Sequence, residues 1–94
     1  MDIKHERRRK KGAFFVGERG ERLARIEYFY SHPGEITVYH TEVDERLRGR
    51  QIGEQLVAAV VNFARENGLK IVPTCPYTKK VIDRTPEFQD VLAR

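Results

Sequence analysis

Three arginines and two glycines lie close together just before a segment that has the apolar spacing of a helix. They occupy the run Arg46-Leu47-Arg48-Gly49-Arg50-Gln51-Ile52-Gly53. The first N–H groups of a helix have no intrahelical partner, and the helix dipole favours negative charge there. An arginine side chain can bind a phosphate through two hydrogen bonds, and a glycine lets a ligand come close to the backbone. Both features suit a diphosphate or a nucleotide phosphate. The run therefore predicts a phosphate site, with one alternative, in which its arginines pair with Asp44, Glu45 and Glu54.

The glycine spacing in this run differs from two common phosphate loops. A Walker A loop needs Gly-Lys-Ser or Gly-Lys-Thr, and a dinucleotide fingerprint needs a third glycine in a tight turn between strand and helix. Gly49 and Gly53 meet neither requirement. Both classes of nucleotide site are therefore excluded here.

A cysteine and a histidine are candidates for nucleophilic or acid–base chemistry. Cys75 falls where a predicted strand ends and a predicted helix begins, a position that lowers the pKa of a thiol. It is either a nucleophile that forms an acyl thioester or a small buried residue. His40 could act as a base at neutral pH, or could be a structural strand histidine. Glu42 on the same strand face could relay its proton through water, or could be a solvated or salt-bridged carboxylate. The histidines and Cys75 lack the spacing of metal ligands, so no metal site is predicted.

A small mixed α+β fold must position these residues. Alternation of apolar and polar residues predicts strands, and a spacing of three and four predicts helices. The strands are expected over residues 13–17, 22–30, 35–43 and 69–74, a long helix from Ile52 to a stop at Asn67-Gly68, and short helices over 77–84 and after Thr85, with Phe88, Val91 and Leu92 buried. The first three strands form an antiparallel meander, and the fourth lies parallel to the third because a right-handed helical crossover joins them.

Length and cysteine content limit the remaining classes. A chain of 94 residues supports a single domain over residues 1–94. One cysteine cannot form an internal disulfide, so a reducing compartment, the cytoplasm, is expected. The longest apolar run, Leu56 to Val61, is too short to span a membrane, and the N-terminus lacks the apolar stretch of a signal peptide. We expect a monomer or a weak homodimer paired through an exposed sheet edge.

The net charge of +4 lies entirely in residues 1–12, and the rest of the chain is balanced. Such a basic N-terminal arm could bind nucleic acid. The alternatives are a solvated arm or an edge strand whose charges discourage aggregation. We favour these alternatives, and expect nucleic acid not to be a partner, because a neutral body lacks the broad positive face that phosphate-driven binding needs.

The order of strand, arginine-glycine loop, amphipathic helix and strand resembles the GCN5-related N-acetyltransferases (GNAT). Their signature is Arg or Gln, two residues, Gly, one residue, then Gly or Ala. Arg48 and Gly53 match it, and Gln51 stands where the first signature glycine is usual. The runs 69–77 and 86–90 are similar to those of a small subfamily of minimal, single-domain members of about this length. The resemblance covers nearly the whole chain from about Ala13.

The resemblance implies a truncated GNAT-like fold that binds acetyl-coenzyme A, without the elements that build much of the acceptor site in longer members. It implies these positions: the backbone of Arg48, Gly49, Arg50, Gln51, Ile52 and Gly53 at the pyrophosphate; the strand edge Thr41, Glu42 and Val43 at the pantetheine arm; and the thioester near His40, Thr41, Thr74 and Cys75. Tyr77 would protonate the departing sulfur.

Three functions follow as hypotheses. The first is an N-acetyltransferase that moves an acetyl group from coenzyme A to an unknown amine, with Cys75, His40 and Tyr77 as catalytic residues. The second is a non-catalytic acyl-coenzyme A binding module, because the acceptor elements are missing. The third is a small nucleic-acid-binding protein that uses the basic arm. The amine acceptor cannot be read from the sequence.

Overall fold

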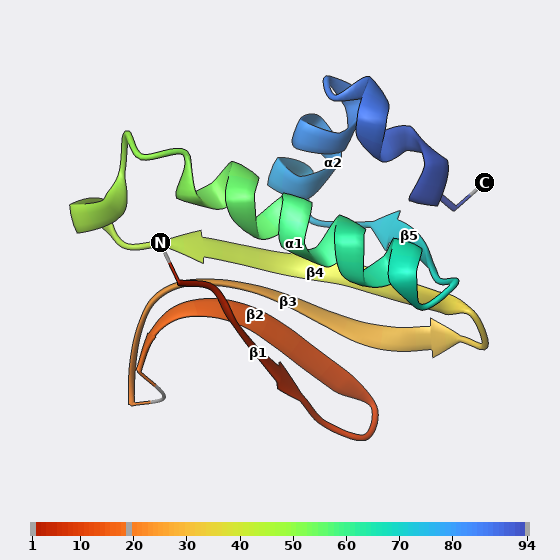
Figure 1. The fold of residues 1–94 in the computed structure, drawn as a ribbon, viewed down its shortest axis with the longest axis horizontal. Coiled ribbons are helices and arrows are strands. Elements are labelled where there is room, and N and C mark those ends of the chain that lie inside the picture. Colours follow the sequence, from red (N-terminus) through yellow and green to blue (C-terminus); the bar gives the residue numbers. More distant parts are fainter. Residues whose placement is uncertain (1, 19, 94) are drawn as a thin grey trace.

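The fold is a single five-stranded sheet with its helices gathered on one side (Figure 1). The computed structural model describes residues 2–18 and 20–93. The strands are β1 (Lys4–Arg7), β2 (Lys11–Glu18), β3 (Glu21–His32), β4 (Glu35–Val43) and β5 (Lys70–Pro73), and the helices are α1 (Ile52–Glu66) and α2 (Pro76–Asp83). Two short 3-10 helices, η1 (Glu45–Leu47) and η2 (Pro86–Val91), follow β4 and α2. The strands pair in sequence order, antiparallel throughout except that β5 lies parallel to β4.

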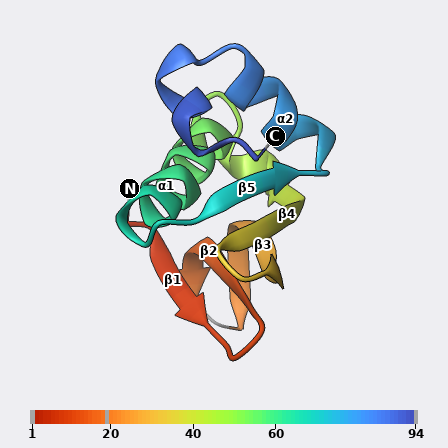
Figure 2. The same ribbon diagram turned by 90° about the vertical axis from the view of Figure 1, so that its right-hand side faces the viewer.

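Alternation along β3 decides which face of the sheet is buried. Ile26 and Tyr28 are almost completely buried, and α1 covers that face with its own apolar stripe, which includes Leu56 and Val60 (Figure 2). The neighbouring residue Glu27 points to the opposite face. We call this opposite side of β1–β4 the open face, because α1 packs on the other side. The predicted α+β class, the crossover helix and the parallel strand after it are confirmed.

The basic N-terminal segment forms the edge strand β1. Its register pairs Glu6 with Ala13 of β2. Lys4 lies 3.4 Å from a carboxylate oxygen of Glu18, and the guanidinium of Arg7 lies 5.4 Å from the centre of the Phe63 ring. Of the alternatives for this segment, the structure therefore shows the edge strand, and the sheet has five strands where the sequence predicted four. Charges mask the alternation of this segment, which is why the sequence left the choice between an arm and an edge strand open.

The C-terminal segment closes the other edge of the sheet. The Ala93 N–H donates to the Ile71 carbonyl at 2.8 Å, so the end of the described chain runs along the outer side of β5. The predicted last helix is a six-residue 3-10 helix that begins after Thr85, whose side chain makes no capping bond. Val91 is buried, and Phe88 and Leu92 pack against the core as predicted. Among the described residues, no helix has the length and apolarity needed to cross a membrane.

An aromatic cluster holds β1 against the helix side of the sheet. The His5 ring stacks on Phe14 with ring centres 3.9 Å apart and meets Phe63 edge-on at 4.7 Å. Its Nε2 atom lies 2.8 Å from the Tyr28 hydroxyl. Burial, with a smaller contribution from the charge of Arg7, lowers the pKa of His5 below 6.5. His5 is therefore favoured in its neutral form in the folded protein.

Acidification is expected to destabilise the protein through His5. Because the folded state lowers the pKa, the unfolded chain binds a proton more readily once the pH falls below about 6.5. The free energy of unfolding should therefore drop as the pH falls through that value. Urea denaturation at a series of pH values, compared with His5→Phe, isolates this contribution. A difference between the two proteins that stays constant with pH would contradict it.

Candidate functional site

In the loop between β4 and α1, one arginine is paired with a carboxylate and two form no ion pair with a described residue. Asp44 caps η1 by accepting from the Arg46 backbone N–H at 2.8 Å, and its carboxylate also accepts from the Arg46 side chain at 3.0 and 3.1 Å. These bonds lower the pKa of Asp44 to about 2. Arg48 and Arg50 are exposed and form no ion pair with any described residue. Pairing with nearby carboxylates, the alternative raised by the sequence, thus holds for Arg46 only.

The backbone of this loop turns sharply before α1 begins. Gly49 has φ 83° and Gln51 has φ 58°, both in the left-handed region. Gln51 is the N-cap residue of α1 and provides no side-chain capping bond. The N–H groups of the first turn, from Ile52 onward, therefore remain available to an anion. A cavity of about 320 Å³ opens beside them, lined on its other sides by Val43 and Tyr77.

The left-handed Gln51 stores strain that a glycine would relieve. Holding a residue with a Cβ in this conformation costs about 1–2 kcal/mol. Glycine avoids this cost, but it offsets part of the gain because a glycine makes the unfolded chain more flexible. Gln51→Gly should therefore raise the free energy of unfolding by about 0.5–1 kcal/mol, measured by urea denaturation. Gln51→Ala, which keeps the Cβ, is the matched control and should bring no such gain. Equal stability of the two variants would show that the loop is unstrained.

Tyr77 of α2 lies against the first turn of α1. A Cβ atom added to Gly53 would come within 2.5 Å of the Tyr77 hydroxyl oxygen, so the glycine makes room for this ring. Burial, followed by the charge of Glu54, raises the pKa of Tyr77 above 10.0. The hydroxyl is therefore protonated at neutral pH and can donate a proton into the cavity that it lines.

The thiol of Cys75 lies where β4 and β5 part. Their pairing ends at Val38, whose carbonyl accepts from the N–H groups of both Thr74 and Cys75 at 3.1 Å. Cys75 is the N-cap residue of α2 and is 6% exposed. Its Sγ lies 3.5 Å from the Thr41 hydroxyl, which lies 3.2 Å from the hydroxyl of the fully buried Thr78.

This environment lowers the pKa of the Cys75 thiol. Burial by itself raises the pKa of the thiol. Hydrogen bonds from the Thr41 hydroxyl, from the backbone and hydroxyl of Thr78 and from the Tyr77 backbone outweigh it, so the net pKa is below 9.0. The sequence indicated Cys75 and missed Thr78. The signal for Thr78 was its place three residues after the cap, where a helix N–H points back at the cap side chain.

His40 lies on the opposite side of β4 from the thiol. It pairs in register with Glu27 on the open face, whereas the adjacent Thr41 points toward α2. The His40 Nε2 is 3.9 Å from a Glu42 oxygen, and Glu42 also pairs with Arg25 at 3.2 Å. The structure thus places Thr41 and Cys75 together and separates His40 and Glu42 from them by the thickness of one strand.

The predicted pantetheine edge extends beyond the end of β5. The Asp44 N–H donates to the Leu23 carbonyl of β3 at 2.7 Å. Backbone N–H and C=O groups point to alternate edges along a strand. Those of Glu42 therefore point toward β3, and those of Thr41 and Val43 point to the opposite edge of β4. Thr74 closes the end of the gap by donating from its hydroxyl to the Val38 carbonyl at 3.3 Å. In the described part of the chain, no three His, Cys, Asp or Glu side chains are grouped as metal ligands.

Comparisons with known proteins agree with this geometry. A family model described as GCN5-related N-acetyl-transferase matches residues 13–91. Protein NATD1 of Danio rerio is 30% identical over 89 residues, which cover 95% of this chain and 80% of that protein. A GCN5-like solution structure from Staphylococcus aureus superposes with a TM-score of 0.78 and 35% identity, over 98% of this chain and 87% of that one. A Bacillus anthracis structure in complex with acetyl coenzyme A shares the fold, with a TM-score of 0.57 and 15% identity over 70% of this chain and 39% of that one.

Proposed function

Because the chain belongs to the GCN5-related N-acetyltransferase family, we propose that it uses acetyl-coenzyme A to acetylate an amine. The observation that carries the proposal is the loop that precedes α1, together with the cavity beside it. It combines unpaired Arg48 and Arg50, available N–H groups and an adjoining cavity of about 320 Å³. Two cations and a helix start match the charge of a pyrophosphate. The similar protein solved with acetyl coenzyme A has the same fold, which supports this choice of cofactor.

Each part of the cofactor is proposed to contact its own group of residues. The pyrophosphate would contact Arg48, Arg50 and the backbone from Gly49 to Gly53. The pantetheine arm would bind along the free edge of β4 at Thr41 and Val43. Glu42, also predicted at this edge, points its backbone toward β3, and its side chain is assigned to the open face because it lies beside Arg25 and His40. Thr74 would close the end of the groove, next to Cys75.

The cofactor, when bound, supplies an acetyl thioester, and the protein's own groups would move its acetyl group and its protons. The Cys75 thiolate would form a bond to the acetyl carbon, and the bond from that carbon to the coenzyme sulfur would break. The leaving sulfur would take up a proton that the Tyr77 hydroxyl, which lies at Gly53, supplies through water. The acceptor amine then attacks the acetyl carbon on Cys75. The carbon–sulfur bond breaks, restoring the thiolate, and His40 accepts the proton from the amine. Tyr77, which is 37% exposed, recovers its proton from solvent.

Titration with acetyl-coenzyme A followed by intact-mass measurement tests this function. Calorimetric binding together with a mass increase of one acetyl group, discharged by an added amine, is the expected result. Binding without an adduct or any transfer would instead favour the non-catalytic binding module. No binding at low salt would exclude both.

We further propose a reducing, cytoplasmic location and a monomer or weak homodimer. The single cysteine is a free thiol, and β1 is the terminal strand of the sheet. The basic N-terminal segment is assigned to the sheet and not to nucleic acid, because Lys4 and Arg8 already pair with carboxylates.

A further inference from the structure

One row of residues crosses the open face from the N-terminal strand to His40. Register pairs Glu6 of β1 with Ala13 of β2, Ala13 with Glu27 of β3, and Glu27 with His40 of β4. Alternation places all four on the side of the sheet away from α1. The row therefore connects the proposed base to the far edge of the sheet along a single line.

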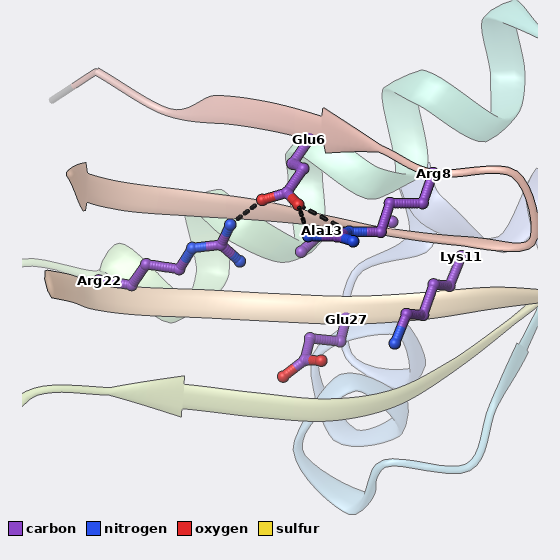
Figure 3. A pocket seen from close by; sticks show the side chains of 7 residues that line it. Glu6, Arg8, Lys11, Ala13, Arg22 and Glu27 are labelled. Atoms are coloured by element: carbon purple, nitrogen blue, oxygen red, sulfur yellow. Dashed lines mark hydrogen bonds and ion pairs between the residues drawn. The ribbon is translucent and has the colours of Figure 1, made fainter. Parts of the chain in front are cut away.

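A pocket of about 380 Å³ lies in this row, with the small side chain of Ala13 at its floor. Figure 3 shows charged side chains around it: Glu6, Arg22, Glu27, Arg8 from the hairpin between β1 and β2, and Lys11 at the start of β2. The alanine creates the hollow, because larger side chains stand around it. Gly12 continues the floor toward the hairpin.

The carboxylates of this pocket are already engaged, and one of its cations is not. Glu6 pairs with Arg22 and, at 2.8 Å, with Arg8. Glu27 pairs with Arg25 at 2.8 Å and accepts from the Tyr39 hydroxyl at 3.1 Å. Lys11 forms no ion pair with any described residue. The lining thus holds three cations against two carboxylates, and the unmatched charge is the ammonium of Lys11.

We propose that this pocket holds an anionic group of the amine acceptor, with Lys11 as its main contact. Strands lie about 4.8 Å apart, so the pocket floor at Ala13 is about 10 Å, two strand spacings, from the backbone of His40. A ligand whose anion rests over Ala13 places an amine near His40 when the two groups are roughly 7–10 Å apart. The acceptor class is then an amine with a carboxylate or a phosphate at that distance.

This inference rests on the proposed function and adds to it the direction from which the acceptor arrives. The cofactor groups, Arg48 and the Cys75 thiol, lie around the helix side and the end of β4. His40 and the pocket share the open face. The two reactants would therefore approach β4 from opposite sides and meet at the gap beyond Val38, where β5 ends.

A binding measurement tests the pocket without any acetyl transfer. Hexanoate and hexyl phosphate carry the anion and no amine, and the methyl group of Ala13 reports on the pocket floor by NMR. Either ligand should shift the Ala13 methyl signal in the wild type, and Lys11→Gln should weaken that binding about tenfold. Lys10→Gln removes the same charge one residue away and is the matched control. An unmoved Ala13 signal, or equal effects of the two variants, would overturn the proposal.

A kinetic measurement then tests the acceptor class. ω-Aminohexanoate and the matching aminoalkyl phosphate, compared with hexylamine, show which anion is used. Lys11→Gln should raise the KM of the better anionic acceptor about tenfold and leave hexylamine unchanged. Hexylamine acetylated as well as both anionic amines would overturn the acceptor role. A shifted Ala13 signal with no transfer to any amine would support the pocket and overturn the proposed function.

Discussion

Cys75→Ala is expected to abolish the covalent acetyl adduct and to lower the rate of amine acetylation about a thousandfold or more. Removing a nucleophile deletes the covalent route, and losses of this size are usual for such residues. Cys75 suits this role because it is the N-cap residue of α2 and because hydrogen bonds with Thr41, Thr78 and Tyr77 overcome the effect of burial on the pKa of its thiol. Intact-mass measurement after mixing with acetyl-coenzyme A, together with steady-state acetylation of an amine, measures both effects.

Thr78→Val is a milder variant that tests how the surroundings of Cys75 set the pKa of its thiol. It removes a buried hydroxyl next to Thr41 and keeps the shape of the side chain. The pKa of Cys75 should then rise, so the pH profile of thiol alkylation should shift to higher pH while acetyl-coenzyme A binding is retained. If Cys75→Ala still transfers acetyl at the wild-type rate, Cys75 is a small buried residue, and His40 would have to assist direct attack by the amine.

Local patterns in the sequence were sufficient to predict most of the fold. The alternation of Ile26 and Tyr28 with charged neighbours predicted β3, and the apolar spacing from Ile52 predicted α1 to within one residue of its observed end. For β1 the sequence left a solvated arm and an edge strand as alternatives, because its pattern is carried by His5 and by the stems of charged residues. His5 is buried only through its contacts with Phe14 and Phe63, which are distant in the sequence.

The parts of the candidate site that are formed by residues adjacent in the sequence could be predicted. The parts that depend on how the strands pair in the sheet could not. The phosphate loop is contiguous, so its arginines and glycines were evident. Which arginine is free depended on the cap formed by Asp44, which engages Arg46. That His40 and Cys75 occupy opposite sides of β4 followed from strand register and from the packing of Thr41 on Thr78. The pocket at Ala13 depends on the pairing of β1 with β2, and the sequence did not decide between an arm and an edge strand for that segment.

Replacing both Arg48 and Arg50 with alanine is expected to weaken acetyl-coenzyme A binding about 30–150-fold, since each lost charge-assisted contact to phosphate is worth roughly 1–1.5 kcal/mol at an exposed site. Neither arginine pairs with a described carboxylate, so the free protein should lose little stability. Calorimetry at several salt concentrations should also show a shallower salt dependence in the double variant, because two phosphate contacts are gone.

Arg46→Ala is the matched control for the double variant, because it removes an arginine of the same loop whose charge is already neutralised by Asp44. It should disturb η1 and leave the affinity for acetyl-coenzyme A within about threefold of the wild type. If Arg46→Ala weakens binding as much as the double variant does, the loop acts through its shape and not through free cations. The pyrophosphate would then be held by the backbone from Gly49 to Gly53 alone.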